Sequence, residues 1–88
     1  MNKLFSDDAW EDLCAWSADK QTLKRINALL KDIERNGNMG IGRPEPLKYD
    51  LTGYWSRRIS DKDRLIYKVD EETDTIYIIG CKGRYEEG

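Results

Sequence analysis

Glu45 is the acidic side chain whose surroundings best suit general-base chemistry. It stands between Pro44 and Pro46 in the run GRPEPLK. The two prolines fix the backbone on both sides of the carboxylate and exclude a helix there. A single acid held this rigidly is suited to act as a positioned base. The alternative is a surface residue on a stiff loop.

Three arginines follow in two segments that we expect to be neighbouring strands. Arg57 and Arg58 lie in the run WSRRI, and Arg64 begins the run RLIY. Guanidinium groups on adjacent strands of an open sheet suit phosphate, which they bind bidentately. The alternative is a pair of cross-strand ion pairs with Asp61 or Asp63.

Residue types that usually hold metals or cofactors are scarce. The chain has no histidine, so zinc binding and imidazole acid–base catalysis both lack their usual residue. Cys14 and Cys81 lie far apart without Cys-x-x-Cys spacing, and we expect free thiols. The acidic run 70–74 lacks the spacing of a calcium loop and is expected to be a hairpin turn. We therefore predict no metal site and no cofactor.

Composition and charge indicate a small folded domain with one basic face. Eighty-eight residues, 39% apolar and 36% charged, with three Trp and five Tyr, are typical of a single soluble domain. No apolar run is long enough for a membrane span or a signal peptide, so we expect a cytoplasmic protein. The net charge is −2, yet residues 41–69 carry seven Lys or Arg against four Asp or Glu. This segregation predicts a basic surface.

The hydrophobic pattern predicts an α+β fold in the order β-α-α-β-β-β. A short strand at 3–5 precedes Ser6, which is suited to begin a helix that fades near Asp19. A second apolar stripe with three-and-four spacing runs from Leu23 to Ile33 and stops at Asn36-Gly37. A loop rich in Gly and Pro, 37–46, then leads to an antiparallel meander. Its predicted strands are 54–59, 65–69 and 75–81.

Strand alternation predicts which side chains face the helices, because successive residues point to opposite sides of a sheet. The predicted helix-covered set is Trp55, Ile59, Leu65, Tyr67, Val69, Tyr77, Ile79 and Cys81. The predicted open set is basic and consists of Arg58, Arg64, Lys68, Lys82 and Arg84. Arg57 falls on the buried parity, and a bulge would flip part of the assignment.

Four motifs resemble the YoeB family of toxins, the Txe/YoeB branch of the RelE/ParE superfamily. They are KRIN at 24–27, RPEPLK at 43–48, GYWSRRI at 53–59 and RLIY at 64–67, and Trp10 and Trp16 also match. The similarity runs in one uninterrupted order from Leu4 to Tyr85. It implies a single RelE-like toxin domain over residues 1–88.

The resemblance implies the toxin of a type II toxin–antitoxin system that occupies the ribosomal A site and cuts mRNA there without a metal. In this family the 2′-hydroxyl attacks the adjacent phosphate and leaves a cyclic phosphate and a free 5′-hydroxyl. By resemblance, Glu45 takes the hydroxyl proton and Arg64 stabilises the pentavalent phosphate. The expected RNA-binding residues are Lys48, Arg57, Arg58 and Tyr85. Tyr85 would stack on a base or orient the scissile group, and its alternative role is to cap the sheet edge.

The chain departs from the family at its C-terminal end. The family ends in a stretch with His-Tyr, whereas this chain has CKGRY, so Arg84 takes the histidine's place. That histidine is the family's candidate acid for the leaving 5′-oxygen, but a guanidinium with a pKa above about 12 cannot give up a proton near pH 7. Loss of a general acid typically costs about 100- to 10,000-fold in rate. We count Arg84 in the catalytic set and expect impaired cleavage. The exchange is either natural or an inactivating substitution.

Two further functions and several partners remain open from the sequence. One alternative is a non-catalytic module that binds the ribosome or an antitoxin. The other is gyrase inhibition, as in the ParE branch, against which the PEP loop and Arg64 argue. The resemblance also implies a cognate antitoxin of the YefM/Phd type, contact with ribosome and mRNA, and a homodimer.

Overall fold

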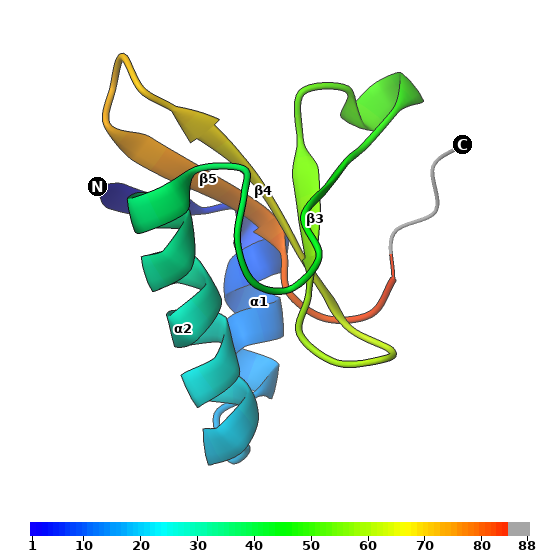
Figure 1. Cartoon of the computed structure of the whole chain (residues 1–88). Coiled ribbons are helices and arrows are strands. Elements are labelled where there is room, and N and C mark those ends of the chain that lie inside the picture. The colour runs from blue at the N-terminus through cyan, green and yellow to red at the C-terminus, as the bar shows by residue number, and fades with distance from the viewer. Residues whose placement is uncertain (85–88) are drawn as a thin grey trace.

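The computed structural model describes residues 1–84 as two helices packed against one face of a five-stranded sheet (Figure 1). In chain order the elements are β1 (Asn2–Phe5), α1 (Asp7–Ala15), α2 (Lys20–Asn36), β2 (Glu45–Pro46), the 3₁₀ turn η1 (Tyr49–Leu51), β3 (Trp55–Arg58), β4 (Arg64–Asp70) and β5 (Thr75–Gly80). The predicted α+β, RelE-like fold class is confirmed, and the predicted elements occur in the expected order, with β2 as one additional strand. In the described part of the chain, no helix is long and apolar enough to cross a membrane.

Both helices begin and end where local chemistry favours it. Ser6 caps α1, its hydroxyl accepting a hydrogen bond from the amide of Ala9. Asp19 caps α2 in the same way through the amide of Thr22, at 3.0 Å. The helix ends at Gly37, whose φ of 64° lies in the left-handed region that glycine adopts without strain.

The strands are ordered β1-β5-β4-β3-β2, with β1 parallel to β5 and every other pair antiparallel. Strand β2 was not predicted, because its two residues fall in a segment that we expected to be a loop. Its proline is tolerated because β2 lies at the sheet edge, where one side of the strand needs no partner. The edge strand places Glu45 in the sheet and gives it a defined register.

The core lies between the helices and the sheet. Helix α2 buries four apolar side chains on one face, and the strands supply the opposing layer. The buried members are Ala9, Ile26, Leu29, Leu30, Ile33, Ile59, Leu65, Tyr67, Ile76, Ile78 and Cys81. Trp55 and Val69 pack against them. The predicted faces of β3 and β4 are therefore confirmed.

The predicted faces of β5 were wrong at Tyr77 and Ile79 and right at Cys81. Ile76 and Ile78 are the residues fully buried against the helices. Tyr67 pairs with Ile78 while the adjacent Ile66 pairs with Gly80, so β5 holds one extra residue, Ile79, at a bulge. A bulge reverses the alternation beyond it. As a result, two consecutive residues face away from the core before Cys81 faces it again.

Arg57 is completely buried and ties the two layers together. Its exposed fraction is 0%, and its Nη1 binds the carboxylate of Asp32 on α2 at 2.5 Å. Nε donates to the hydroxyl of Tyr67 on β4 at 3.1 Å. The remaining bonds go to three carbonyl oxygens of the loop after α2, at Gly37 (2.7 Å), Met39 (3.0 Å) and Ile41 (3.0 Å). Every N–H of the guanidinium is satisfied, as a buried charge requires.

Two glycines let the loop 37–43 close around this guanidinium. A Cβ on Gly40 would lie 2.0 Å from the carboxylate of Asp32, and one on Gly42 would lie 2.8 Å from Leu29. Both glycines also have positive φ, at 126° and 82°. The GIG run therefore serves the packing of the loop onto α2 and Arg57, and it leads directly into β2.

Replacing Asp32 with Ala should lower the free energy of unfolding by about 3 kcal/mol, because a buried charge loses its counterion. Urea unfolding followed by circular dichroism measures this. Glu34→Ala is the matched control, since Glu34 lies two residues further along α2 in a partly exposed pair with Lys3. Similar losses in the two variants would contradict a central role for the Arg57–Asp32 pair.

Stability should also fall with acid through the same pair. The hydrogen bond from Arg57 holds the pKa of Asp32 below its ordinary value of 3.8, against the opposing effect of burial. A lowered carboxyl pKa contributes stability above the unfolded pKa and loses it as the pH falls through the folded one. The difference in unfolding free energy between the parent chain and Asp32→Asn should thus be constant above about pH 5 and shrink below about pH 4. A difference that grows with acid would contradict this assignment.

Candidate active site

The sheet register places Glu45, Arg58 and Arg64 on the face opposite the helices. Glu45 pairs with Ser56 on β3, and Arg58, two residues further along β3, pairs with Arg64 on β4. Paired residues, and residues two apart along a strand, point to the same side of a sheet. Standard strand spacings put the Cα atoms of Glu45 and Arg58 about 8 Å apart. Side chains of this length can meet at one substrate group.

Glu45 is exposed and its backbone is fixed from both sides. The amide of Leu47 donates to the carbonyl of Tyr54 at 2.9 Å, and the amide of Arg58 donates to the carbonyl of Gly42 at 2.7 Å. These bonds join the segments before and after Glu45 to β3. The carboxylate therefore stands on a rigid backbone while its side chain faces solvent, as a base that meets a substrate must.

Arg64 is held by main-chain oxygens rather than by carboxylates. Its Nη1 donates to the carbonyls of Ser60 (2.7 Å), Asp61 (3.3 Å) and Asp63 (3.1 Å). Within residues 1–84 it forms no ion pair, so the alternative of cross-strand pairs with Asp61 or Asp63 is not observed. Nη1 alone makes these hydrogen bonds, so the rest of the guanidinium group can bind a phosphate.

Arg58 is half-buried, and its side chain points to the open face of the sheet. Among residues 1–84 its guanidinium has no hydrogen-bond or ion-pair partner. Its main-chain carbonyl accepts a hydrogen bond from Arg25 of α2 at 3.0 Å. The backbone is thus tied to the helical layer while the charged group stays available.

The chain after β5 is anchored at two points. The amide and carbonyl of Cys81 bind the carboxylate of Asp12 (3.0 Å) and the indole N–H of Trp16 (2.8 Å), both from the α1 region. The amide of Gly83 then donates to the carboxylate of Asp63 at 2.7 Å. Asp63 was absent from the predicted site. The sequence gives little indication of its anchoring role, because a carboxylate in a polar turn usually faces solvent.

These anchors bring Arg84 beside Arg64. Arg84 is exposed, and its Nη2 donates to the carbonyl of Asp61 at 2.7 Å, the same oxygen that Arg64 approaches. Two guanidinium groups with no described carboxylate partner thus meet at one turn. Such a cluster suits a multiply charged phosphate. Tyr85 lies outside the described residues.

Three other predicted basic residues have different surroundings. Arg57 cannot bind RNA as we expected, because its guanidinium is buried and fully used inside the fold. Lys82 lies 5.7 Å from the ring of Trp16, beside the end of α1, rather than on the open sheet face. Lys48 is exposed at the start of η1, close in sequence to Glu45.

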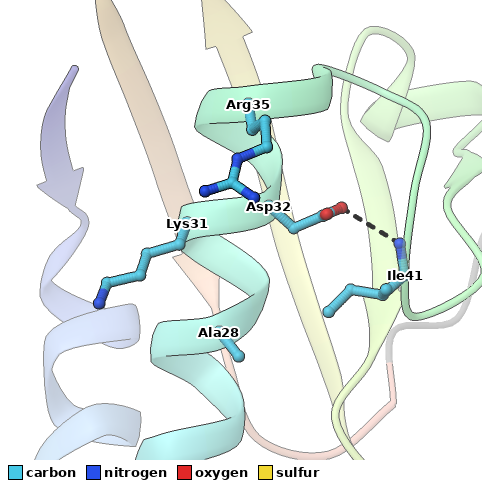
Figure 2. Close-up of a pocket in the computed structure, with 5 residues that line it drawn as sticks. All are labelled: Ala28, Lys31, Asp32, Arg35 and Ile41. Carbon is cyan, nitrogen blue, oxygen red and sulfur yellow. Dashed lines mark hydrogen bonds between the residues drawn. The ribbon is translucent and has the colours of Figure 1, made fainter.

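A hollow of about 270 Å³ lies on the helical layer, away from these residues. It is bounded by Ala28, Lys31, Asp32, Arg35 and Ile41. Figure 2 shows Asp32 pointing from α2 toward the amide of Ile41, with which it forms a hydrogen bond at 3.1 Å. This bond closes the loop onto the helix. None of the predicted catalytic residues borders the hollow.

A family comparison decides which proteins this chain is related to. The model of the YoeB-like toxins of bacterial type II toxin–antitoxin systems matches residues 5–85. The chain belongs to this family. The toxin YoeB of Escherichia coli K12 is 42% identical over 86 residues, covering 97% of this chain and 100% of that protein. The toxin RelK of Mycobacterium tuberculosis is 46% identical over 82 residues, or 92% of each chain.

Solved YoeB structures share the whole fold. A YoeB/ParE toxin from Agrobacterium tumefaciens superposes with a TM-score of 0.92 at 35% identity, covering 97% of this chain and 100% of its own. A YoeB dimer from Staphylococcus aureus gives 0.89 at 49% identity, with 97% and 98% covered. A heterotetrameric YoeB–YefM toxin–antitoxin complex from the same organism gives 0.88 at 49% identity and the same coverage.

The two cysteines of this YoeB-like toxin should differ in reactivity. Burial, and secondarily the charge of Asp12, raises the pKa of Cys81 to about 12, so almost no thiolate exists at pH 8. Cys14 is exposed. Iodoacetamide should therefore add one label per native chain and two after denaturation, as counted by mass spectrometry. Equal labelling of both in the native protein would show that the chain after β5 is not anchored as described.

Proposed function

We propose that this toxin is a ribosome-dependent endoribonuclease that cuts mRNA in the A site without a metal and is slowed by Arg84. The proposal is supported above all by one arrangement: Glu45, Arg58 and Arg64 share an open face beside Arg84. A carboxylate flanked by guanidinium groups suits proton removal next to a phosphate. Membership of the YoeB-like toxins supports the substrate class.

In the proposed reaction Glu45 takes the proton of a ribose 2′-hydroxyl. The freed oxygen attacks the adjacent phosphorus, and the bond to the 5′-oxygen of the next nucleotide breaks. Arg64 stabilises the extra charge on the pentavalent phosphate, an effect typically worth about 100- to 1000-fold for one well-placed donor. Arg58 and Lys48 hold neighbouring phosphates. The products are a cyclic phosphate and a 5′-hydroxyl end.

Arg84 limits the last proton transfer of this scheme. A guanidinium binds phosphate but keeps its proton at neutral pH, so the leaving 5′-oxygen takes its proton from water. Arg84 and Arg64 share the Asp61 carbonyl, which supports the proposal that both charges contact the same phosphate. Substrate binding is therefore preserved while turnover is slow. Tyr85 remains a proposed stacking residue.

A YefM-type antitoxin and a second copy of the chain are the proposed protein partners. The support is that Staphylococcus aureus YoeB has been solved as a dimer and in a heterotetrameric complex with YefM. An acidic antitoxin segment would complement the basic cluster and cover Glu45. Because the proposed target is the ribosome, the proposed location is the cytoplasm.

The second candidate function is non-catalytic binding to the ribosome or the antitoxin. Arg84 favours it, because this residue strengthens anion binding and supplies no proton. Under this alternative, growth inhibition would persist in Glu45→Arg, whereas the nuclease proposal requires that inhibition be lost. A third possibility, gyrase inhibition, would require a change in DNA supercoiling.

Primer extension on mRNA in translating ribosomes tests the nuclease proposal. Arg84→His should raise the cleavage rate by about 100-fold, and Glu45→Gln in that background should lower it by about 100-fold or more, since each change restores or removes a proton-transfer group. Arg64→Ala should cost about 100- to 1000-fold. Arg35→Ala is the control, because Arg35 lies on the helical layer. Cleavage that is insensitive to Glu45→Gln would overturn the proposal.

A further inference from the structure

A lysine held between two tyrosine rings occupies the open sheet face beyond the proposed catalytic residues. The Nζ of Lys68 lies 5.2 Å from the ring centre of Tyr54 and 5.3 Å from that of Tyr77. Lys68 pairs with Tyr77 across β4 and β5, and Tyr54 directly precedes the Trp55–Tyr67 pair on β3. The three side chains therefore form one row across the sheet, which we call the Tyr–Lys–Tyr row.

The row continues the face that carries the proposed catalytic residues. Lys68 and Arg64 are four residues apart on β4 and so point to the same side, about 13 Å apart along the strand. Tyr54, the residue before β3, shares its parity with Ser56, and Ser56 pairs with Glu45. An RNA strand held at Glu45 and Arg64 can thus extend along β4 toward Lys68.

The three side chains of the row lie outside the hydrophobic core. Each of the three is half-buried rather than part of the core, which lies on the other side of the sheet. Lys68 forms no ion pair within residues 1–84, and its ammonium faces the two rings instead. An uncompensated cation between π surfaces offers the two things that single-stranded RNA needs, a phosphate contact and rings for base stacking.

The acidic β4–β5 turn bounds the row on its far side. Asp70 is two residues beyond Lys68, and its Oδ1 accepts hydrogen bonds from the amides of Glu72 (3.0 Å) and Thr73 (3.3 Å). Repulsion from the carboxylates of residues 70–74 disfavours a longer RNA path. The row is therefore the last contact of a strand that begins at the catalytic residues.

We propose that Tyr54, Lys68 and Tyr77 form a subsite that binds the nucleotides next to the scissile phosphate, by stacking of bases on the rings and a phosphate contact to Lys68. The inference rests on the proposed function, which sets the direction of the RNA strand across the sheet. The ligand class is single-stranded RNA, either the mRNA or an unpaired segment of ribosomal RNA.

Binding of a labelled 2′-O-methyl oligoribonucleotide tests the subsite without cleavage, because the attacking hydroxyl is blocked. Tyr54→Leu and Tyr77→Leu should each raise the Kd about 5- to 150-fold, the range for loss of one base–aromatic stack. Tyr54→Phe and Tyr77→Phe keep the ring and should bind like the parent chain. Fluorescence anisotropy gives the Kd, and circular dichroism checks folding.

The salt dependence of RNA binding tests the charge of Lys68 separately. Lys68→Gln should weaken binding and reduce the slope of log Kd against log salt by about 0.7, the value for one phosphate contact to a single strand. Lys31→Gln, on the helical layer, is the matched control and should leave the slope unchanged. An unchanged slope in Lys68→Gln, or parent-like binding by folded Leu variants, would overturn the subsite.

Ultraviolet cross-linking on programmed ribosomes separates the two RNA sources. A Tyr77-dependent cross-link to mRNA assigns the row to the substrate strand, and one to ribosomal RNA assigns it to ribosome docking. No Tyr77-dependent cross-link to either would contradict the subsite. Oligonucleotide binding does not require turnover. A chain that binds the oligonucleotide but never cuts mRNA would therefore contradict the nuclease proposal and still support the subsite.

Discussion

The buried charge of Arg57 is the constraint on which the remaining architecture depends. A guanidinium inside a domain of this size is tolerated only when each of its donors finds an acceptor. The chain meets that demand with Asp32 of α2, the hydroxyl of Tyr67 and three loop carbonyls. The loop cannot move away without leaving three of the guanidinium N–H groups unsatisfied. Because the same loop leads into β2, the position of Glu45 follows from the satisfaction of Arg57.

Strand alternation gives two consecutive arginines opposite surroundings. Arg57 points into the core and its guanidinium is fully paired, while Arg58 points to the open face and its guanidinium has no partner in the described chain. One side of β3 therefore stabilises the fold and the other carries charge for a ligand. The turn between β3 and β4 also serves two residues, because the carbonyl of Asp61 accepts hydrogen bonds from both Arg64 and Arg84.

Much of this was predictable from the sequence, and the failures have distinct physical reasons. Helix caps, the α+β order and the shared face of Arg58 and Arg64 follow from local patterns and strand parity. The β5 faces were wrong because a bulge at Ile79 depends on pairing with β4, which single-strand alternation does not contain. Arg57 was predicted to bind RNA because it is charged, although its strand parity already placed it on the helix-covered face of the sheet. The role of Asp63 as an anchor was not predicted, because its partner, the amide of Gly83, lies 20 residues away.

The bonds from Arg57 to the loop after α2 do not constrain the side chains of Met39 and Ile41. They end on carbonyl oxygens of Gly37, Met39 and Ile41, which every residue type possesses. The inner surface of the loop is thus specified by backbone shape, while Met39, 76% exposed, and Ile41 contribute side chains that the buried charge does not constrain. Substitutions at those two positions can reshape the outer surface of the loop without disturbing the position of Glu45.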